Sequence, residues 1–269
     1  MDGDMNEGAI VLHAPEDFAG MRAAGQLAAR TLDMITPYVQ AGVTTGELDD
    51  RIHAFMVAQG GVSATIGYRG YEKASCISIN HVVCHGIPGD KAIKEGDILN
   101  IDVTVILDGW FGDTSRMYTV GTPSIKAQNL IDATYESLML AIKAVRPGAT
   151  LGDVGHVIQT YAEERRFSVV RDFCGHGIGR TFHAAPNVLH YGRPGRGVVL
   201  RPGMFFTIEP MLNIGRPDVK ILGDGWTAVT RDRSLSAQFE HMMGVTEDGC
   251  EVFTYSPAGL NKPPYNTAG

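Results

Sequence analysis

Residues 98–120 read ILNIDVTVILDGWFGDTSRMYTV and predict a long antiparallel hairpin. Ile98 to Leu107 form a nearly continuous apolar run, as expected of a buried strand. Asp108-Gly109 is the two-residue turn signal that joins antiparallel strands, and residues 110–120 return alongside the first strand. We therefore expect these two strands to pair with each other.

The register of this hairpin brings two carboxylates together. With the turn at residues 108–109, Thr104 lies opposite Asp113, and Asp102 lies one diagonal step from Asp113 on the same face. Buried charges are costly, and two neighbouring carboxylates repel each other unless a cation lies between them. The structural alternative is that one aspartate caps the turn at Asp113-Thr114-Ser115 and that the other pairs with Arg116.

The sequence repeats a helical start signal roughly one hundred residues later. Residues 44–47 (TTGE) have the form of a capping box, and residues 150–153 (TLGD) repeat it with aspartate in the last position. Apolar residues at helical spacing follow each signal. A further helical pattern precedes each one, near residues 15–39 and again before Pro147-Gly148.

A strand pattern repeats at nearly the same spacing. GDILNID at residues 96–102 aligns with GMFFTIE at residues 203–209. Each segment is an extended apolar run that ends in a carboxylate, Asp102 in the first and Glu209 in the second. We interpret the chain as two similar halves that face each other across a pseudo-twofold axis, so that Asp102 and Glu209 meet at the centre.

Helices segregated from antiparallel strands predict the α+β class. The two halves would span about residues 12–122 and 123–255, within a single domain of residues 1–269. Further strands are expected near residues 204–213, 236–246 and 250–255, with a turn at residues 247–249 and a loop or frayed tail over residues 256–269.

Glu209 and Glu240 also lie in predicted apolar strands, so each would bury a charge at a cost in free energy, as Asp102 does. His176 lies between glycines, which let another group approach closely. Buried acids on several strands require a common counter-charge. Two divalent cations, which lie roughly 3.5–4 Å apart in such sites, suit this oxygen-rich set. The predicted metal ligands are Asp102, Asp113, His176, Glu209 and Glu240.

Composition excludes several classes of protein. The chain carries 30 acidic and 23 basic side chains, a net charge of −7, so we expect no specific nucleic-acid partner. Residues 1–20 lack the apolar run of a signal peptide, and no stretch approaches the roughly 20 apolar residues of a membrane span. We expect a cytoplasmic protein without a membrane partner. The four cysteines form no CxxC pair and are expected to be reduced, in or near the core.

Six segments, taken in order, resemble the type I methionine aminopeptidases in their short bacterial form. The similarity covers nearly the whole chain, from about residue 12 to 255. The segments are CHGIP at 84–88, NIDVT at 100–104, GDTS at 112–115, GHGIGRTFH at 175–183, TIEP at 207–210 and QFEH at 238–241. The resemblance implies the pita-bread fold, which agrees with two duplicated halves, and a single catalytic domain.

The resemblance also assigns roles to residues. It implies that the five predicted ligands bind two metal ions, with Asp113 and Glu240 bridging them and Glu209 also moving the proton of a bridging hydroxide. His85 and His183 would be catalytic and would contact the substrate, at the scissile amide nitrogen and at the carbonyl oxygen. The methionine pocket would be lined by Thr65, Tyr68, Tyr71, Cys76, Phe182 and Trp226.

The implied reaction is hydrolytic removal of the initiator methionine from nascent proteins. The metal-bridging hydroxide would attack the first peptide bond, and the crowded cleft would favour a small second residue. Cobalt, manganese, iron and zinc all suit this ligand set. The expected partners are the N-termini of nascent polypeptides, met at the ribosome, and the enzyme is expected to be a monomer.

The sequence departs from the family pattern at positions near the predicted pocket. Glu72 stands where many relatives have proline, Thr65 where a pocket cysteine is common, and His81 where glutamate is frequent. Residues 184–186 (AAP) lack the acids common after the histidine at position 183. These changes leave the ligands intact and bear on the breadth of the pocket.

Two other functions fit parts of this pattern. A prolidase or X-Pro aminopeptidase shares the ligand set but usually carries an additional N-terminal domain. A non-catalytic binding protein on the same fold would typically have lost metal ligands, whereas all five candidates are present here.

Overall fold

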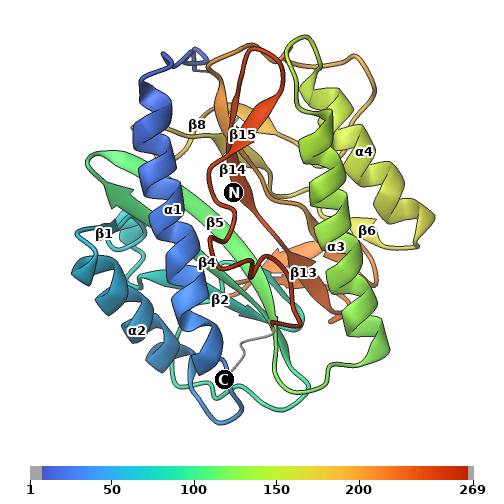
Figure 1. Ribbon diagram of the computed structural model, residues 1–269. Helices are drawn as coiled ribbons and strands as arrows, with labels where there is room; N and C mark the ends of the chain where they lie inside the picture. The colour runs from blue at the N-terminus through green and yellow to red at the C-terminus, as the bar shows by residue number, and fades with distance from the viewer. Residues whose placement is uncertain (1–7, 266–269) are drawn as a thin grey trace.

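The computed structural model describes residues 8–265 as a layer of helices over antiparallel strands (Figure 1). This arrangement confirms the α+β class. The start of the acidic N-terminal stretch, residues 1–7, and the last four residues of the tail lie outside the described part. The helices are α1 (Asp17–Ile35), α2 (Thr45–Ala58), α3 (Ile125–Ala144) and α4 (Leu151–Glu164), with short 3₁₀ helices at Thr36–Tyr38 (η1) and Tyr68–Gly70 (η2).

The predicted hairpin is present. Strands β4 (Ile98–Leu107) and β5 (Trp110–Thr119) pair along their whole length, with Thr104 opposite Asp113 as expected. Asp108 and Gly109 both have positive φ, 50° and 77°, which is the conformation that a type I′ turn requires. The turn chemistry therefore sets the register, and the register sets the face on which the carboxylates lie.

The strands form two larger and two smaller sheets. Around β4 lie β1 (Val62–Ser63), β2 (Ser75–Ile79) and β5. The second large sheet has the order β15-β14-β9-β7-β8, formed by Cys250–Val252, His241–Val245, Phe205–Ile208, Gly175–Gly177 and Ala184–Val188. The smaller sheets are β13-β10-β6 (Ser236–Gln238, Met211–Asn213, Ser168–Val169) and β11-β12-β3 (Val219–Ile221, Ala228–Thr230, Val82–Cys84).

The helices repeat between the two halves of the chain. Both α2 and α4 have 14 residues, and both begin with a complete capping box, at Thr44 with Glu47 and at Thr150 with Asp153. Helix α1 packs on β4 and β5, whereas α3 packs on β9, β10 and β13. Figure 1 shows the pairs α1/α2 and α3/α4 on opposite flanks of the strands. The repeated sequence pattern thus corresponds to a repeated structural unit.

The strands expected at residues 204–213 and 236–246 are each interrupted, which corrects the prediction. Strand β9 belongs to the five-stranded sheet and β10 to a smaller one, and the chain passes between them at Glu209-Pro210. It returns from β13 to β14 at Phe239-Glu240. Two predicted ligands therefore lie where the chain changes sheets. The helix expected to end at Pro147-Gly148 ends earlier, at Ala144.

The tail is a loop, as predicted, but its described part is not frayed. Residues 256–265 run between α1 and α3 (Figure 1). The Tyr265 hydroxyl donates to the backbone oxygen of Met117 at 2.7 Å, and the Lys262 ammonium pairs with Asp132 at 2.8 Å. The tail is therefore tied to β5 and to α3.

Each half has its own apolar core. In the first half α1 and α2 pack on strands β2, β4 and β5, and in the second α3 and α4 pack on β9, β10 and neighbouring segments. The four cysteines are unpaired, and Cys76 and Cys84 are buried, in agreement with the prediction of reduced thiols. Over residues 8–265, no helix combines the length and apolarity needed to cross a membrane.

The two capping boxes give a matched test of the duplication. We expect Thr44→Ala and Thr150→Ala each to lower the free energy of unfolding by about 1 kcal/mol, because each removes the hydrogen bond to the third backbone N–H of its helix. Urea denaturation measures the change. Thr160→Ala on the exposed face of α4 is the control, with an expected change within about 0.5 kcal/mol. Equal stability of all three variants would contradict the capping role.

Candidate metal centre

Predicted ligands from both halves meet on the strands. Asp113 comes from β5, His176 from β7 and Glu240 from the crossing between β13 and β14, and their ligand atoms all lie within 4.8 Å of one another. His176 Nε2 is 3.5 Å from Asp113 Oδ2 and 3.7 Å from Glu209 Oε1. Four of the five predicted ligands are therefore close neighbours in space.

The fifth predicted ligand, Asp102, lies on β4 beside this group. It is paired with Ser115 in the ladder and is one diagonal step from Asp113, as the hairpin register predicts. Its pKa is raised well above the ordinary value, first by burial and then by the negative charges of Asp113 and Glu209. Asp102 is therefore electrostatically part of the same cluster.

Hydrogen bonds to backbone oxygens hold the two halves together at this point. The Glu240 N–H donates to the Ser115 carbonyl oxygen at 3.1 Å, and the Thr114 hydroxyl donates to the Glu240 carbonyl oxygen at 2.7 Å. The Asn100 amide also donates to the Gln238 carbonyl oxygen at 2.8 Å. One backbone–backbone and two side chain–backbone hydrogen bonds thus fix the position of Glu240 relative to β5.

Within residues 8–265, the ion pairs of these buried carboxylates involve one imidazole, His176, which cannot balance four acids. Burial raises the pKa of Glu240 well above its ordinary value, and Asp113 and Glu209 raise it further. Burial raises the pKa of Glu209 to about 7, against the opposing effect of His176. The structural alternative, a pair between an aspartate of the cluster and Arg116, is wrong, because the buried Arg116 guanidinium pairs with Asp33.

This excess of buried negative charge is typical of a site that binds cations. Oxygen-rich clusters with one imidazole match the preferences of Mn²⁺, Fe²⁺, Co²⁺ and Zn²⁺. A cation between the carboxylates removes their mutual repulsion and favours their charged forms. The donor set therefore fits divalent metal ions.

Polar neighbours orient the carboxylates. The Thr207 hydroxyl donates to Glu209 Oε1 at 2.9 Å, and the Gln238 amide donates to Glu209 Oε2 at 3.3 Å. The Thr104 hydroxyl donates to Asp113 at 2.9 Å. Such outer partners hold metal-binding groups in place. Sequence analysis did not identify these residues; only Thr104 had a signal, its place opposite the aspartate in the hairpin.

A buried histidine fixes the backbone of Glu209. His190 is fully buried, and burial lowers its pKa to about 3, so its ring is neutral at pH 7. Its Nε2 accepts a hydrogen bond from the Glu209 N–H at 3.1 Å. This contact holds the chain where it leaves β9, and sequence analysis also missed it.

The two predicted catalytic histidines are present as neutral imidazoles at neutral pH. Burial lowers the pKa of His85 to about 4, and the surrounding protein lowers that of His183, which lies at the exposed edge of the site. His183 Nδ1 lies 2.8 Å from the Tyr68 hydroxyl, and its ring is 4.2 Å from that of His176. His183 thus lies directly beside the carboxylate cluster.

Aromatic rings surround a predicted pocket next to these histidines. The ring centroids of Tyr71 and Trp226 lie 4.9 Å apart, and those of His85 and Trp226 lie 6.0 Å apart. Tyr68 and Phe182 are likewise 5.0 Å apart. Sequence analysis missed two further rings, Phe111 stacked on Phe182 at 5.6 Å and Phe173 against His85 at 5.3 Å.

Two more predicted pocket residues have distinct surroundings. Cys76 is buried and opposite Asp102 in the ladder, and burial raises the pKa of its thiol, so it stays protonated. The Thr65 hydroxyl donates to the Lys73 carbonyl oxygen at 2.7 Å, so it is used within its own loop.

The buried Asp49 supports the segment that carries one wall of the predicted pocket. Asp49 on α2 accepts hydrogen bonds from the Ser75 hydroxyl at 2.6 Å and the Ala74 N–H at 3.3 Å. The Tyr71 hydroxyl in turn donates to the Ser75 carbonyl oxygen at 2.8 Å. Helix α2 therefore positions one wall of the pocket through β2.

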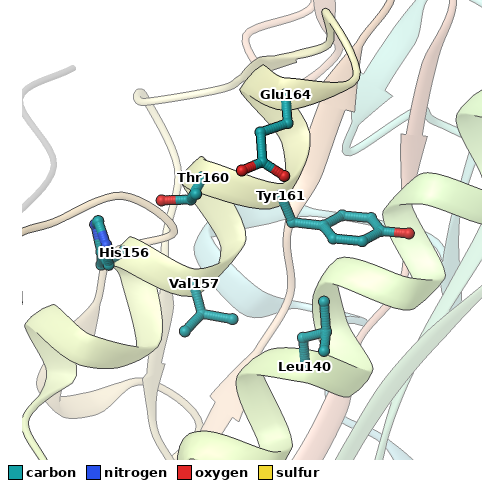
Figure 2. Close-up of a pocket in the computed structure, with 6 residues that line it drawn as sticks. All are labelled: Leu140, His156, Val157, Thr160, Tyr161 and Glu164. Atoms are coloured by element: carbon teal, nitrogen blue, oxygen red, sulfur yellow. The ribbon is translucent and has the colours of Figure 1, made fainter.

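A surface hollow of about 260 Å³ lies elsewhere, between α3 and α4 (Figure 2). It is lined by Leu140, His156, Val157, Thr160, Tyr161 and Glu164, none of which belongs to the predicted site. The site residues and this hollow are thus separate features.

Comparison with known proteins gives one consistent family. Residues 19–247 match metallopeptidase family M24. A methionine aminopeptidase from Rickettsia prowazekii is 58% identical over 257 residues, which cover 95% of this chain and 99% of the relative. A methionine aminopeptidase from Escherichia coli is 56% identical over 248 residues, which cover 91% and 94%.

Solved structures agree with the sequence relatives. The crystal structure of methionine aminopeptidase from Rickettsia prowazekii matches with a TM-score of 0.91 and covers 91% of this chain and 100% of that one. A prolidase from Pyrococcus horikoshii, 20% identical with a TM-score of 0.71, shows the pita-bread fold alone; this chain covers 63% of it. The chain therefore has the pita-bread fold and belongs to metallopeptidase family M24, within it to the methionine aminopeptidases.

Proposed function

We propose that this metal-dependent aminopeptidase removes the initiator methionine from nascent polypeptides that have a small second residue, using two divalent cations. The observation that carries the proposal is the meeting of Asp113, His176 and Glu240 within 4.8 Å, next to two neutral histidines and an aromatic pocket. Together they supply the parts of a hydrolytic site that acts on one end of a peptide.

Five side chains would hold the cations. Asp113, His176 and Glu240, with Glu209 and Asp102 beside them, would hold the ions, and Asp113 and Glu240 are the proposed shared ligands. When bound, such ions polarise a carbonyl group and lower the pKa of water. Manganese, iron, cobalt and zinc all fit these ligands.

Glu209 would move the proton during hydrolysis. Its two oxygens receive hydrogen bonds from Thr207 and Gln238, so the carboxylate is held in one orientation. Bound cations would favour its charged form, so that it can accept a proton from water and pass it on. It would take the proton from the attacking water and deliver it to the leaving amine.

His183 would stabilise the charge that develops on the substrate oxygen. If the Tyr68 hydroxyl donates to Nδ1, the neutral ring keeps its proton on Nε2 and can donate it in a hydrogen bond to the scissile carbonyl. His85, also neutral, would contact the scissile amide nitrogen.

The methionine side chain would occupy the aromatic pocket. Tyr71, Phe182, Trp226 and the protonated Cys76 present rings and sulfur, which suit a flexible thioether. Tyr68 would close the pocket on the side of His183, and Thr65 would support its loop.

The proposed substrates indicate where in the cell the reaction takes place. Initiator methionine occurs on chains leaving the ribosome, so the proposal places the enzyme in the cytoplasm at that point. All residues that the proposal uses belong to one chain, so a monomer suffices.

Peptide hydrolysis tests the proposed function. The metal-stripped protein supplemented with Mn²⁺ is expected to release methionine from Met-Ala-Ser but not from its N-acetylated form, because the pocket and cluster receive a free N-terminus. Ala-Pro-Ser is the comparison substrate, with release followed by chromatography. Preferential cleavage of Ala-Pro-Ser would replace the proposal with an X-Pro specificity, and no release from any peptide would favour the binding-protein alternative.

Asp113→Asn tests the metal assignment without measuring activity. In the parent protein, Mn²⁺ at about 100 times its Kd should add roughly 2.7 kcal/mol to the free energy of unfolding. Asp113→Asn removes a central ligand and should lose most of this gain. The control, Asp90→Asn, changes an exposed aspartate and should keep it. Denaturant unfolding with and without Mn²⁺ measures both, and an unchanged gain in Asp113→Asn would exclude this residue as a ligand.

Glu209→Gln tests the proton transfer. We expect kcat for Met-Ala-Ser to fall by about 100-fold or more, the usual contribution of a general acid–base group. Calorimetric titration with Mn²⁺ must accompany the kinetics, so that lost metal binding is distinguished from lost proton transfer. Glu136→Gln on the exposed face of α3 is the matched control and should leave kcat unchanged. Wild-type turnover in Glu209→Gln would disprove the role.

A further inference from the structure

The turn that carries Tyr68 also brings a positive charge to the edge of the site. Arg69 lies in η2 with a φ of 47°, a conformation that non-glycine residues rarely adopt. Glycines with φ above 80° flank this turn, at positions 67 and 70. The Gly67 N–H donates to the Tyr71 carbonyl oxygen at 2.7 Å and closes the loop. The loop therefore fixes where the arginine emerges.

The arginine side chain is exposed and lies over the ring of Tyr68. Its guanidinium carbon lies 5.5 Å from the centroid of the Tyr68 ring, and the Tyr68 hydroxyl lies 2.8 Å from His183. Arg69 therefore lies beside Tyr68, the residue whose hydroxyl contacts His183.

The geometry of an extended peptide shows which substrate residue would face this charge. In an extended chain the side chains alternate, so the first and third residues point to the same side. Under the proposed function the first side chain enters the pocket that Tyr68 borders. The third side chain would then point toward the same wall, about two residues, or roughly 7 Å, further along the cleft.

We propose that Arg69 is a specificity-determining residue that selects peptides with an acidic side chain at the third position. This inference rests on the proposed methionine aminopeptidase function and names a substrate class for the same site. A guanidinium stays charged at all relevant pH values and binds a carboxylate through two parallel hydrogen bonds. Because the ion pair would be partly exposed, the expected selectivity is modest, about three- to fivefold in kcat/KM.

Matched tetrapeptides test the proposal. The Mn²⁺-loaded full-length protein is assayed on Met-Ala-Glu-Ser, Met-Ala-Gln-Ser and Met-Ala-Lys-Ser, with kcat/KM measured for each at low and high salt. The parent protein should prefer glutamate over glutamine and disfavour lysine. The preference should shrink at high salt, because ions screen exposed charge pairs. Arg69→Gln should abolish the preference while still cleaving Met-Ala-Gln-Ser, and Arg69→Lys should retain part of it.

The controls separate this inference from the proposed function. Arg193→Gln removes an exposed arginine that has no role in the proposed site and should keep the parent preference. A parent protein that cleaves glutamate and glutamine peptides equally, or an Arg69→Gln variant with the full preference, would overturn the inference alone. Failure of the parent protein to cleave any of the three peptides would overturn the proposed function, and the inference with it.

Discussion

The structure depends on one electrostatic constraint, the burial of several carboxylates within a few ångströms of each other. Asp113, His176 and Glu240 converge within 4.8 Å, and the pKa values of Asp102, Glu209 and Glu240 are raised by burial and by their neighbours. The nearby Arg116 does not balance these charges, because its guanidinium pairs with Asp33. Under the proposed function, divalent cations would supply the balancing positive charge and make this cluster a hydrolytic site.

The duplicated fold explains how one chain collects these groups. Each half contributes a strand that carries an acid toward the centre, Asp102 on β4 and Glu209 at the end of β9. Glu209 and Glu240 both lie where the chain crosses between the five-stranded sheet and a smaller one. At each crossing the backbone passes from one sheet to the other, and the glutamate side chain faces the cluster. The main-chain bridge between Ser115 and Glu240 then joins the halves.

Sequence reasoning succeeded where local chemistry decides the structure. The Asp108-Gly109 turn fixed the register of the hairpin, and the capping boxes at Thr44 and Thr150 fixed the starts of two equivalent helices. The prediction of single strands at residues 204–213 and 236–246 was wrong, because a continuous apolar segment predicts one strand even where its two ends join different sheets. Sequence reasoning also missed Thr207, Gln238 and His190, whose roles arise only from tertiary contacts with Glu209.

The assignment of the five ligands to two metal ions is the centre of this account, and anomalous diffraction tests it most directly. Crystals of the Mn²⁺-loaded protein, measured on both sides of the manganese absorption edge, should show two anomalous peaks roughly 3.5–4 Å apart. Asp113 and Glu240 should contact both peaks, and Asp102, His176 and Glu209 should each contact one. No peak at this cluster, or peaks bound elsewhere on the chain, would contradict the account.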